Sequence, residues 1–282
     1  MNTNILQINL NKKLVDLSTP IVMGIVNVTP DSFYKENRFV SDKGIIQCVE
    51  KILAEGGSII DVGGYSTRPS AKVISQEEEI RRVSEALEII LKKFPDVPVS
   101  VDTFRSGVAR EVVKNYRVAM INDIGGGTLD NLMFETIADL QVAYILMHTK
   151  GTPQTMQNQT QYMDIMAELL LFLEKRLAQL RLLGVYDVMV DPGFGFAKTL
   201  EQNYKILNKL SYLQELNVPI LAGISRKSMI YNPLDTDATG ALNGTTAANI
   251  LALIGGASIL RVHDVKEAMQ AIAIFKLYSD CI

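Results

Sequence analysis

Eight short apolar runs, each followed by a longer amphipathic stretch, repeat along this chain and limit what it can fold into. The runs are rich in β-branched residues and apolar on both alternating faces, as strands buried on both sides of a sheet must be. Each run ends in Asp, Asn, His, Ser or Gly. We therefore expect strands at residues 21–26, 58–62, 97–101, 118–121, 142–147, 187–190, 218–222 and 257–262.

The amphipathic stretches predict helices, most clearly at 76–92 and 161–183. In the second stretch apolar residues recur at three- and four-residue spacing on one side, and polar side chains occupy the other. Ser75, followed three residues later by Glu78, resembles a capping box at the start of the first helix. The stretch 240–256 is rich in small residues, which predicts close packing against another helix of this chain or of a partner.

This alternation in a chain of 282 residues favours an α/β fold, a closed (β/α)8 TIM barrel of ordinary length. An open doubly wound sheet is the alternative. No repeat or linker divides the sequence, so we interpret residues 1–282 as a single domain. Before the first strand, Ile8, Leu10, Leu14 and Leu17 surround a polar turn, which predicts a short N-terminal β-hairpin that could close the bottom of the barrel.

Composition excludes several classes of protein. The net charge is −3, with no basic stripe of the kind that nucleic-acid binding needs. Cys48 and Cys281 are the only cysteines, too few for a disulfide framework. No apolar stretch reaches the roughly 18 residues of a membrane span, and the N-terminus does not resemble a secretion signal. We expect a soluble, cytoplasmic protein that binds neither nucleic acid nor membrane.

Polar and charged side chains follow the predicted strands. In a β/α barrel the loops after the strands build the active site, so these side chains would converge on one mouth. A buried polar group without a partner costs about 1–3 kcal/mol, so a set of this size needs mutual pairing or a ligand. The set is Asn27, Asp102, Asn122, Asp191, Lys227, Arg261 and His263.

The charges of this set indicate the chemistry of the ligand. Together with Arg68, the cations Lys227 and Arg261 and the ring of His263 would make the mouth locally positive in an acidic protein. That suits an anionic group such as phosphate or diphosphate. The two carboxylates, Asp102 and Asp191, suit a heterocycle with donor N–H groups.

Simpler interpretations stay open for individual residues. Asp102, Asp123 and Asp264 could each be only the N-cap of the following helix. The glycines at 125–127 suggest a ligand-binding loop but match no phosphate-loop signature. His148, like His263, follows a strand, although a lone histidine is more often structural.

At these residues the sequence strongly resembles the dihydropteroate synthase family, over about residues 21–278. The segments 27–33 and 61–69 look like that family's two signatures. The segments 191–196, Ser225-Arg226-Lys227 and Arg261-Val262-His263 agree with it in order and spacing. Several independent motifs in register make chance similarity improbable.

The resemblance implies a reaction. The family condenses (7,8-dihydropterin-6-yl)methyl diphosphate with 4-aminobenzoate to give dihydropteroate and diphosphate, on the route to folate. It uses Mg²⁺, forms homodimers through barrel helices, and is a sulfonamide target. The electron-rich dihydropterin would stabilise positive charge as the C–O bond breaks, so a dissociative mechanism without a nucleophilic side chain is implied.

The resemblance also implies a role for each candidate residue. Asp191 would accept two hydrogen bonds from the pterin, Lys227 would donate to its carbonyl or ring nitrogen, and Asn27 would hold Mg²⁺ against the diphosphate. Catalytic roles are implied for Lys227, Asp31 and Arg68. The substrate contacts would come from Thr67, Arg68, Asp102, Asn122, Asp191, Phe196, Ser225, Lys227, Arg261 and His263, with Phe196 and Ser225 on the aminobenzoate side and Arg261 stacked on the ring.

Some positions depart from the family's usual pattern. Tyr65 stands where Glu is common, Ser70 where Gly is common, and Thr149-Lys150 where Met-Gln is usual; residues 35–37 replace a glycine-rich stretch. Two other functions compete with the synthase reaction. One is a methyltetrahydrofolate-binding barrel that transfers methyl to a corrinoid, and the other is a non-catalytic pterin-binding or partner protein. The Ser225–Lys227 loop, Arg68 and His263 argue against the first.

Overall fold

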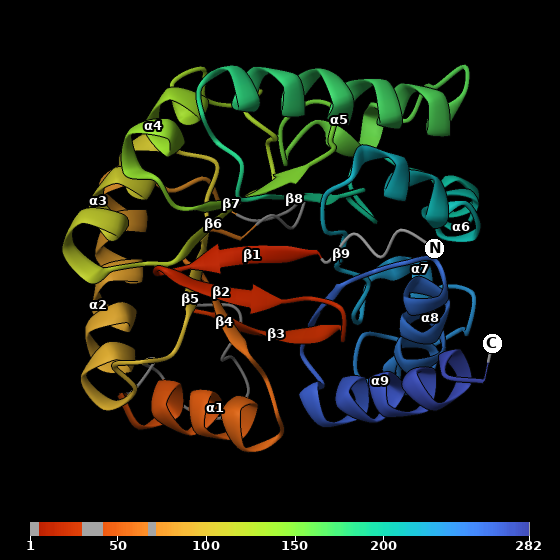
Figure 1. Ribbon diagram of the computed structural model, residues 1–282, viewed down its shortest axis with the longest axis horizontal. Helices are drawn as coiled ribbons and strands as arrows, with labels where there is room; N and C mark the ends of the chain where they lie inside the picture. The colour runs from red at the N-terminus through yellow and green to blue at the C-terminus, as the bar shows by residue number, and fades with distance from the viewer. Residues whose placement is uncertain (1–5, 30–41, 67–71, 282) are drawn as a thin grey trace.

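The computed structural model describes residues 6–29, 42–66 and 72–281 (Figure 1). Within these ranges the strands of the main sheet run parallel in the order β8-β7-β6-β5-β4-β3-β10-β9. A parallel bridge between Val190 and Ile220 joins the two end strands. The sheet therefore closes into a barrel, and the open-sheet alternative is wrong. The strands are β3 Ile21–Asn27, β4 Ile59–Gly63, β5 Val99–Asp102, β6 Met120–Asp123, β7 Ala143–Met147, β8 Val188–Asp191, β9 Leu221–Ala222 and β10 Ile259–Val262.

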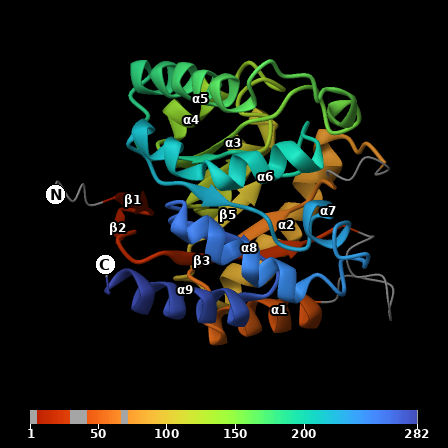
Figure 2. The same cartoon turned by 90° about the vertical axis from the view of Figure 1, so that its right-hand side faces the viewer.

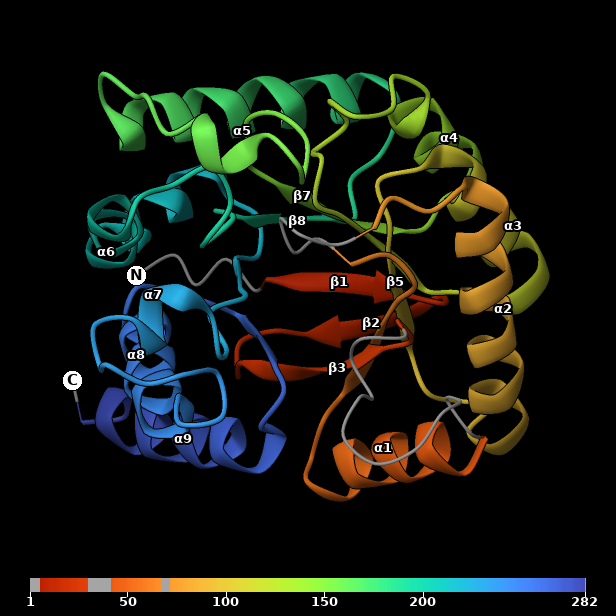
Figure 3. The ribbon, with the colours of Figure 1, turned by 180° about the vertical axis from the view of Figure 1, so that it is seen from behind.

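Helices surround the strands, as Figures 1 and 3 show from opposite sides. Their inner faces and the outward-facing strand residues form the larger hydrophobic core. None of the helices in the described part of the chain is long and apolar enough to cross a membrane. They are α1 Asp42–Ala54, α2 Gln76–Lys93, α3 Ser106–Tyr116, α4 Met133–Leu140, α5 Ile165–Leu182, α6 Leu200–Asn208, α7 Ser228–Tyr231, α8 Leu242–Ile254 and α9 Val265–Ser279, with 3₁₀ turns η1 Met156–Asn158 and η2 Leu210–Leu216.

The helix termini follow local capping chemistry. Helix α5 begins four residues later than predicted, because the Asp164 carboxylate caps it by accepting from the Met166 and Ala167 amides. At α2 the Ser75 hydroxyl accepts from the Glu78 amide, as predicted. The Glu78 carboxylate accepts hydrogen bonds from the arginines at 81 and 82.

The small-residue stretch became helix α8, which packs against α7 and α9. A Cβ at Gly244 would lie 2.7 Å from side-chain atoms of both Ile230 and Leu234. Glycine is therefore what permits the close approach of α8 to α7 and the segment that follows it.

The predicted hairpin is present and closes one end of the barrel (Figure 2). Strands β1 Gln7–Leu10 and β2 Lys13–Asp16 pair antiparallel across a two-residue turn at Asn11 and Lys12, both with positive φ. Ile8, Leu10 and Leu17 are buried against the apolar residues at the N-terminal ends of the barrel strands, Met23 and Ile59 among them. The hairpin therefore fills the end of the barrel opposite the strand C-termini.

Leu14 differs from the other apolar residues of the hairpin. The register pairs it with Asn9, so it lies on the hairpin face opposite Ile8 and Leu10, and its exposed fraction is 70%. The apolar pattern in the sequence does not distinguish Leu14 from its buried neighbours. The two-residue turn sets the register that does.

Truncating the buried face of the hairpin should destabilise the whole barrel. We expect Leu10→Ala to lower the free energy of unfolding by about 2–4 kcal/mol, the usual cost of a buried leucine. The matched control, Leu14→Ala, should stay within about 0.5 kcal/mol because that side chain is exposed. Urea denaturation followed by circular dichroism measures both. Equal losses of unfolding free energy in the two variants would contradict the stabilising role of the buried hairpin face.

Candidate active site

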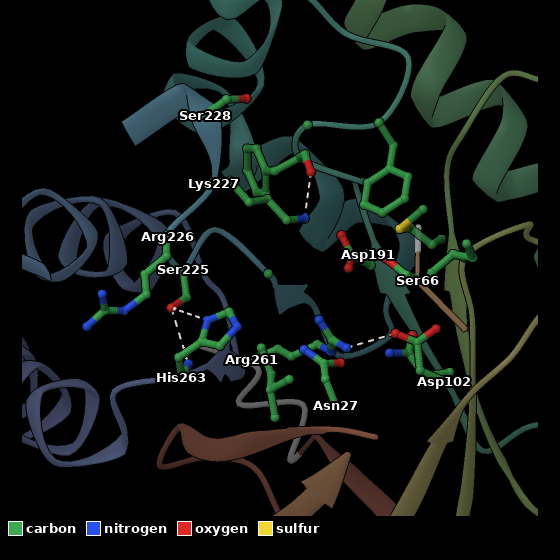
Figure 4. Close-up of a pocket in the computed structure, with 18 of the residues that line it drawn as sticks. Asn27, Ser66, Asp102, Asp191, Ser225, Arg226, Lys227, Ser228, Arg261 and His263 are labelled. Carbon is green, nitrogen blue, oxygen red and sulfur yellow. Dashed lines mark hydrogen bonds and ion pairs between the residues drawn. The ribbon is translucent and has the colours of Figure 1, made fainter. Parts of the chain in front are cut away.

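A cavity of about 310 Å³ opens at the C-terminal ends of the barrel strands (Figure 4). Its walls contain every predicted site residue that the structure describes. Asp31, Thr67 and Arg68 lie outside the described residues. The residues brought together are Asn27, Asp102, Asn122, Asp191, Phe196, Ser225, Lys227, Arg261 and His263.

Strand alternation explains why these side chains meet. Successive strand residues point to opposite faces, so a polar residue at a strand end shares the inward face with the residue two positions earlier. Asp191 follows inward-facing Met189, and Asn122 follows inward-facing Met120. The interior is therefore apolar at the hairpin end and polar at the opposite end.

Arg261 of β10 lies between two carboxylates at this mouth. Its Nε donates to Oδ2 of Asp61 over 2.6 Å, and its Nη2 donates to Oδ2 of Asp102 over 2.8 Å. The Asn122 amide donates to the same Asp61 oxygen over 3.1 Å. Burial raises the pKa of Asp102 to about 7, and the charge of Arg261 opposes that rise. The guanidinium is thus held in place by partners from two other strands.

Asp61 is a functional residue that the sequence analysis missed. It is fully buried and does not line the cavity, but it supports Arg261 and Asn122, which do. The sequence could have identified this residue, because Asp61 is a carboxylate within the apolar run 58–62. A carboxylate inside a buried strand requires a cation or several hydrogen bonds.

Asp191 and Lys227 form a second charged group across the cavity. The Asp191 Oδ1 accepts from the Gly193 amide over 2.7 Å, and burial raises the pKa of its carboxyl while the charge of Lys227 opposes this. Lys227 donates from Nζ to the Phe194 carbonyl over 2.6 Å and lies 4.8 Å from the centre of the Phe196 ring. Burial lowers the pKa of Lys227 to about 8. The remaining acceptor sites of Asp191 face the cavity (Figure 4).

Ser225 and His263 are coupled to each other at the edge of the cavity. Ser225 Oγ lies 3.1 Å from His263 Nδ1 and accepts from the His263 amide over 3.2 Å. Burial lowers the pKa of His263 to about 4, with the charge of Arg261 adding to the effect. The ring is therefore neutral at neutral pH. Of the residues predicted to make the mouth positive, Lys227 and Arg261 are the described ones that carry the charge, and Arg226, which also lines the cavity, is paired with Asp264.

Asn27 of β3 also lines the cavity, and its amide has no hydrogen-bond partner among the described residues. A Cβ at Gly63 would lie 3.2 Å from the Asn27 Oδ1, so the glycine leaves that oxygen accessible. An amide oxygen is a ligand type that Mg²⁺ accepts. In the described ranges no cluster of three or more His, Cys, Asp or Glu side chains could hold a metal ion. Among the described residues, Asn27 would therefore hold a magnesium ion together with oxygens of a ligand or of water.

Several residues outside the cavity have structural roles, but neither Asp123 nor Asp264 is a side-chain N-cap: α4 begins at Met133, and Asp264 makes no capping hydrogen bond to α9. Asp123 accepts from the Gly125 and Gly127 amides over 2.7 and 2.8 Å, so these glycines bind a side chain of the protein. Asp264 forms an ion pair with Arg226. His148 is buried against Lys198.

Residues of the loop after β7 contribute to the cavity without having been predicted. Met156 and Gln157 line it, and Gln157 donates to the Gly195 carbonyl over 3.3 Å. Tyr65, one of the departures from the family pattern, accepts from Gln154 over 2.8 Å. The loops after β4 and β7 are therefore joined at the cavity wall by this tyrosine.

Comparison with known proteins agrees with this geometry. The model of the pterin binding enzyme family matches residues 23–263. Dihydropteroate synthase of Haemophilus influenzae is 40% identical over 94% of this chain and 96% of its own length. That of Escherichia coli is 40% identical over 92% of each chain. The chain belongs to the dihydropteroate synthase family. This membership decides against the corrinoid methyltransferase alternative and places the chain among transferases.

Solved structures of the dihydropteroate synthase family share the fold. The Yersinia pestis enzyme in a sulfonamide drug complex has a TM-score of 0.91 and 35% identity, over 98% of this chain and all of that one. The Thermus thermophilus enzyme in complex with 4-aminobenzoate has a TM-score of 0.85 and 35% identity, over 96% of this chain and 99% of that one.

Removing the guanidinium that Asp61 and Asp102 share should destabilise the protein. We expect Arg261→Met to lower the free energy of unfolding by about 3–5 kcal/mol, because it leaves Asp61 and Asp102 without their cation. The control is Arg81→Met, which breaks two ion pairs at an exposed arginine and should cost no more than about 1 kcal/mol. Chemical denaturation compares the variants. A loss at Arg261 as small as that of the control would show that the carboxylates do not depend on it.

Proposed function

We propose that this protein condenses (7,8-dihydropterin-6-yl)methyl diphosphate with 4-aminobenzoate, giving 7,8-dihydropteroate and diphosphate for folate biosynthesis. The observation that carries the proposal is the convergence of carboxylates and cations on one cavity at the strand ends. The carboxylate of Asp191 suits the donor edge of a pterin, and Lys227 and Arg261 suit a diphosphate. The family membership supports the same reaction.

The pterin would lie among Asp191, Asn122 and Lys227. Asp191 accepts hydrogen bonds from the 2-amino group and N3–H, and its buried position makes such paired bonds selective. Lys227 donates to the ring. Asp102 is already bonded to Arg261, so in this proposal it orients the guanidinium that faces the ring and the diphosphate.

The chemical step needs little acid–base assistance. The C–O bond to the diphosphate breaks, the amine nitrogen of 4-aminobenzoate bonds to the same methylene carbon, and the amine releases a proton. Lys227 and Arg261 stabilise the negative charge that develops on the leaving diphosphate. Positioning the amine against the carbon supplies much of the remaining rate acceleration.

The second substrate would lie against the Phe196 ring and the Lys227 side chain, beside Ser225. The aromatic ring of Phe196 provides an apolar wall for the benzoate ring. We propose that sulfonamides occupy this same part of the cavity and compete with 4-aminobenzoate.

A direct assay tests the reaction. The purified protein is incubated with Mg²⁺, pterin diphosphate and 4-aminobenzoate, and dihydropteroate and diphosphate are separated by chromatography. We expect the two products in equal amounts, with a sulfonamide raising the KM for 4-aminobenzoate only. Absence of product at any protein concentration would exclude the proposed function.

Magnesium belongs to the same proposal. The free amide oxygen of Asn27 would hold the ion together with diphosphate oxygens and water, and the ion would neutralise charge on the leaving group. Asp31, which lies outside the described residues, is a further proposed contact to the metal or the incoming substrate, and Thr67 and Arg68 are proposed contacts to the diphosphate.

Loss of Asn27 should weaken the metal site. We expect Asn27→Ala to raise the Mg²⁺ concentration for half-maximal rate about tenfold, the equivalent of one lost ligand contact. Calorimetric titration of Mg²⁺ into the complex with pterin diphosphate should show the same change. Asn115→Ala, an exposed asparagine on α3, serves as the control. An unchanged Mg²⁺ affinity would remove Asn27 from the metal site.

We also propose a homodimer formed through helices α6 and α8. Between them lies a groove lined by Tyr204, Leu207, Leu251 and Ile254, in which the side chains of Leu251 and Ile254 are each about half exposed. Exposed apolar patches of this kind are typical of protein interfaces. Sedimentation should give twice the chain mass, and Leu251→Lys with Ile254→Lys should give monomers. A monomeric unmodified chain would contradict the proposal.

The cytoplasm is the proposed location. Cys48 and Cys281 are both free thiols, which suits a reducing compartment. Cell fractionation followed by immunoblotting tests this placement, and recovery in the membrane or secreted fraction would contradict it.

A further inference from the structure

The loop after β8, residues 192–197, has an irregular backbone conformation. Gly193, Gly195 and Ala197 all have positive φ, so the backbone turns at alternate residues and forms neither a helix nor a sheet. The loop begins beside Asp191 and presents Phe196 to the cavity. The conformation of the loop therefore determines the position of Phe196 in the part of the cavity proposed to bind 4-aminobenzoate.

Side chains hold this loop through its carbonyl groups. The Phe194 carbonyl accepts from Lys227, the Gly195 carbonyl from Gln157, and the Ala197 carbonyl from Tyr162. The carbonyls of Gly193 and Phe196 both accept from Lys198 Nζ, each over 2.9 Å. All carbonyls from 193 to 197 are thus bound by side-chain donors.

Lys198 is the centre of this arrangement. It is 5% exposed, and its ammonium also contacts the His148 carbonyl over 3.2 Å and the His148 Nδ1 over 3.1 Å. Burial lowers the pKa of His148 to about 2, and the charge of Lys198 adds to this, so the ring is neutral and its Nδ1 can accept. Burial lowers the pKa of Lys198 to about 7, and its one side-chain nitrogen ties the end of β7 to both ends of the loop after β8.

The backbone leaves little freedom around this ammonium. A Cβ at Gly193 would lie 2.1 Å from the His148 carbonyl and 3.2 Å from Lys198 Nζ. Lys198 itself does not line the cavity. It can influence the reaction through the loop that it holds, and its charge also acts to lower the pKa of the Asp191 carboxyl.

We propose that Lys198 is a positioning residue for the second substrate: its ammonium fixes the loop that places Phe196, and the Phe194 carbonyl bonded to Lys227, against 4-aminobenzoate. The inference rests on the proposed function, because it assigns Lys198 to one half of that reaction. Asp191 depends on it less: its backbone belongs to β8 and pairs with Met147 of β7, and only the Gly193 amide connects its carboxylate to the loop. Loss of Lys198 should therefore affect one substrate more than the other.

The test compares the two substrates in Lys198→Met, which keeps the length of the side chain and removes its donors. We expect the KM for 4-aminobenzoate to rise roughly tenfold or more, as displaced positioning groups cause, and the KM for pterin diphosphate to change by less than about threefold. Lys198→Gln retains two of the three donor hydrogens and should give a smaller rise. Should the Met variant fail to fold, the Gln variant carries the comparison.

Two further measurements separate positioning from general destabilisation. Ile206→Ala removes a buried side chain of α6 that does not line the cavity, and it should leave the ratio of the two KM values unchanged. Hydrogen–deuterium exchange without substrates should show faster exchange of residues 193–198 in Lys198→Met, with β4 and β5 unchanged.

The outcomes are distinct. Equal changes in both KM values, or no change in either, would overturn the positioning role, and so would unchanged exchange in residues 193–198. Failure of the unmodified protein to form dihydropteroate would count against the proposed function alone, because the exchange experiment needs no activity.

Discussion

The guanidinium of Arg261, held between Asp61 and Asp102, is the interaction on which the mouth of this barrel depends. It joins β10 to β4 and β5, and through Asp61 it also orders Asn122 of β6. Isolated charges at this depth would be too costly to bury, so each carboxylate requires the shared cation. These connected side chains form one polar side of the cavity, and Asp191 and Lys227 line it as well.

The two ends of the barrel interior show why one fold can serve stability and chemistry separately. At the hairpin end, inward-facing residues are apolar and pack on Ile8 and Leu10. At the opposite end, inward-facing residues are polar and line the cavity. The strands connect both ends, so a rigid core supports side chains that would be destabilising in its centre.

Much of the fold and of the site was predictable from the sequence. The strands were marked by β-branched runs, and the polar residue that follows a run identified Asp102, Asp191 and His263. The alternation of strand residues could have gone further. Asn122 and Asp123 are adjacent, but only Asn122 shares the inward face of Met120 and lines the cavity, whereas Asp123 faces Tyr144 and the glycine turn.

Other features depend on contacts that no local pattern encodes. Asp61 lies within an apolar run, and its partner Arg261 is 200 residues away in the sequence. Lys198 resembles an ordinary lysine before a helix until the loop folds its carbonyls around the ammonium. The exposure of Leu14 follows from the register of a turn. These are consequences of tertiary structure, not of composition or spacing.

The central claim is that inward-facing carboxylates at the strand ends bind the pterin. Calorimetric titration of a pterin into Asp191→Asn and Asp123→Asn tests it directly, because both carboxylates are buried at strand ends and only Asp191 lines the cavity. The account predicts that Asp191→Asn weakens pterin binding roughly ten- to hundredfold, the value of a charge-assisted hydrogen bond, and that Asp123→Asn leaves the affinity nearly unchanged. Equal affinity in the Asp191 variant and the unmodified protein would contradict the account.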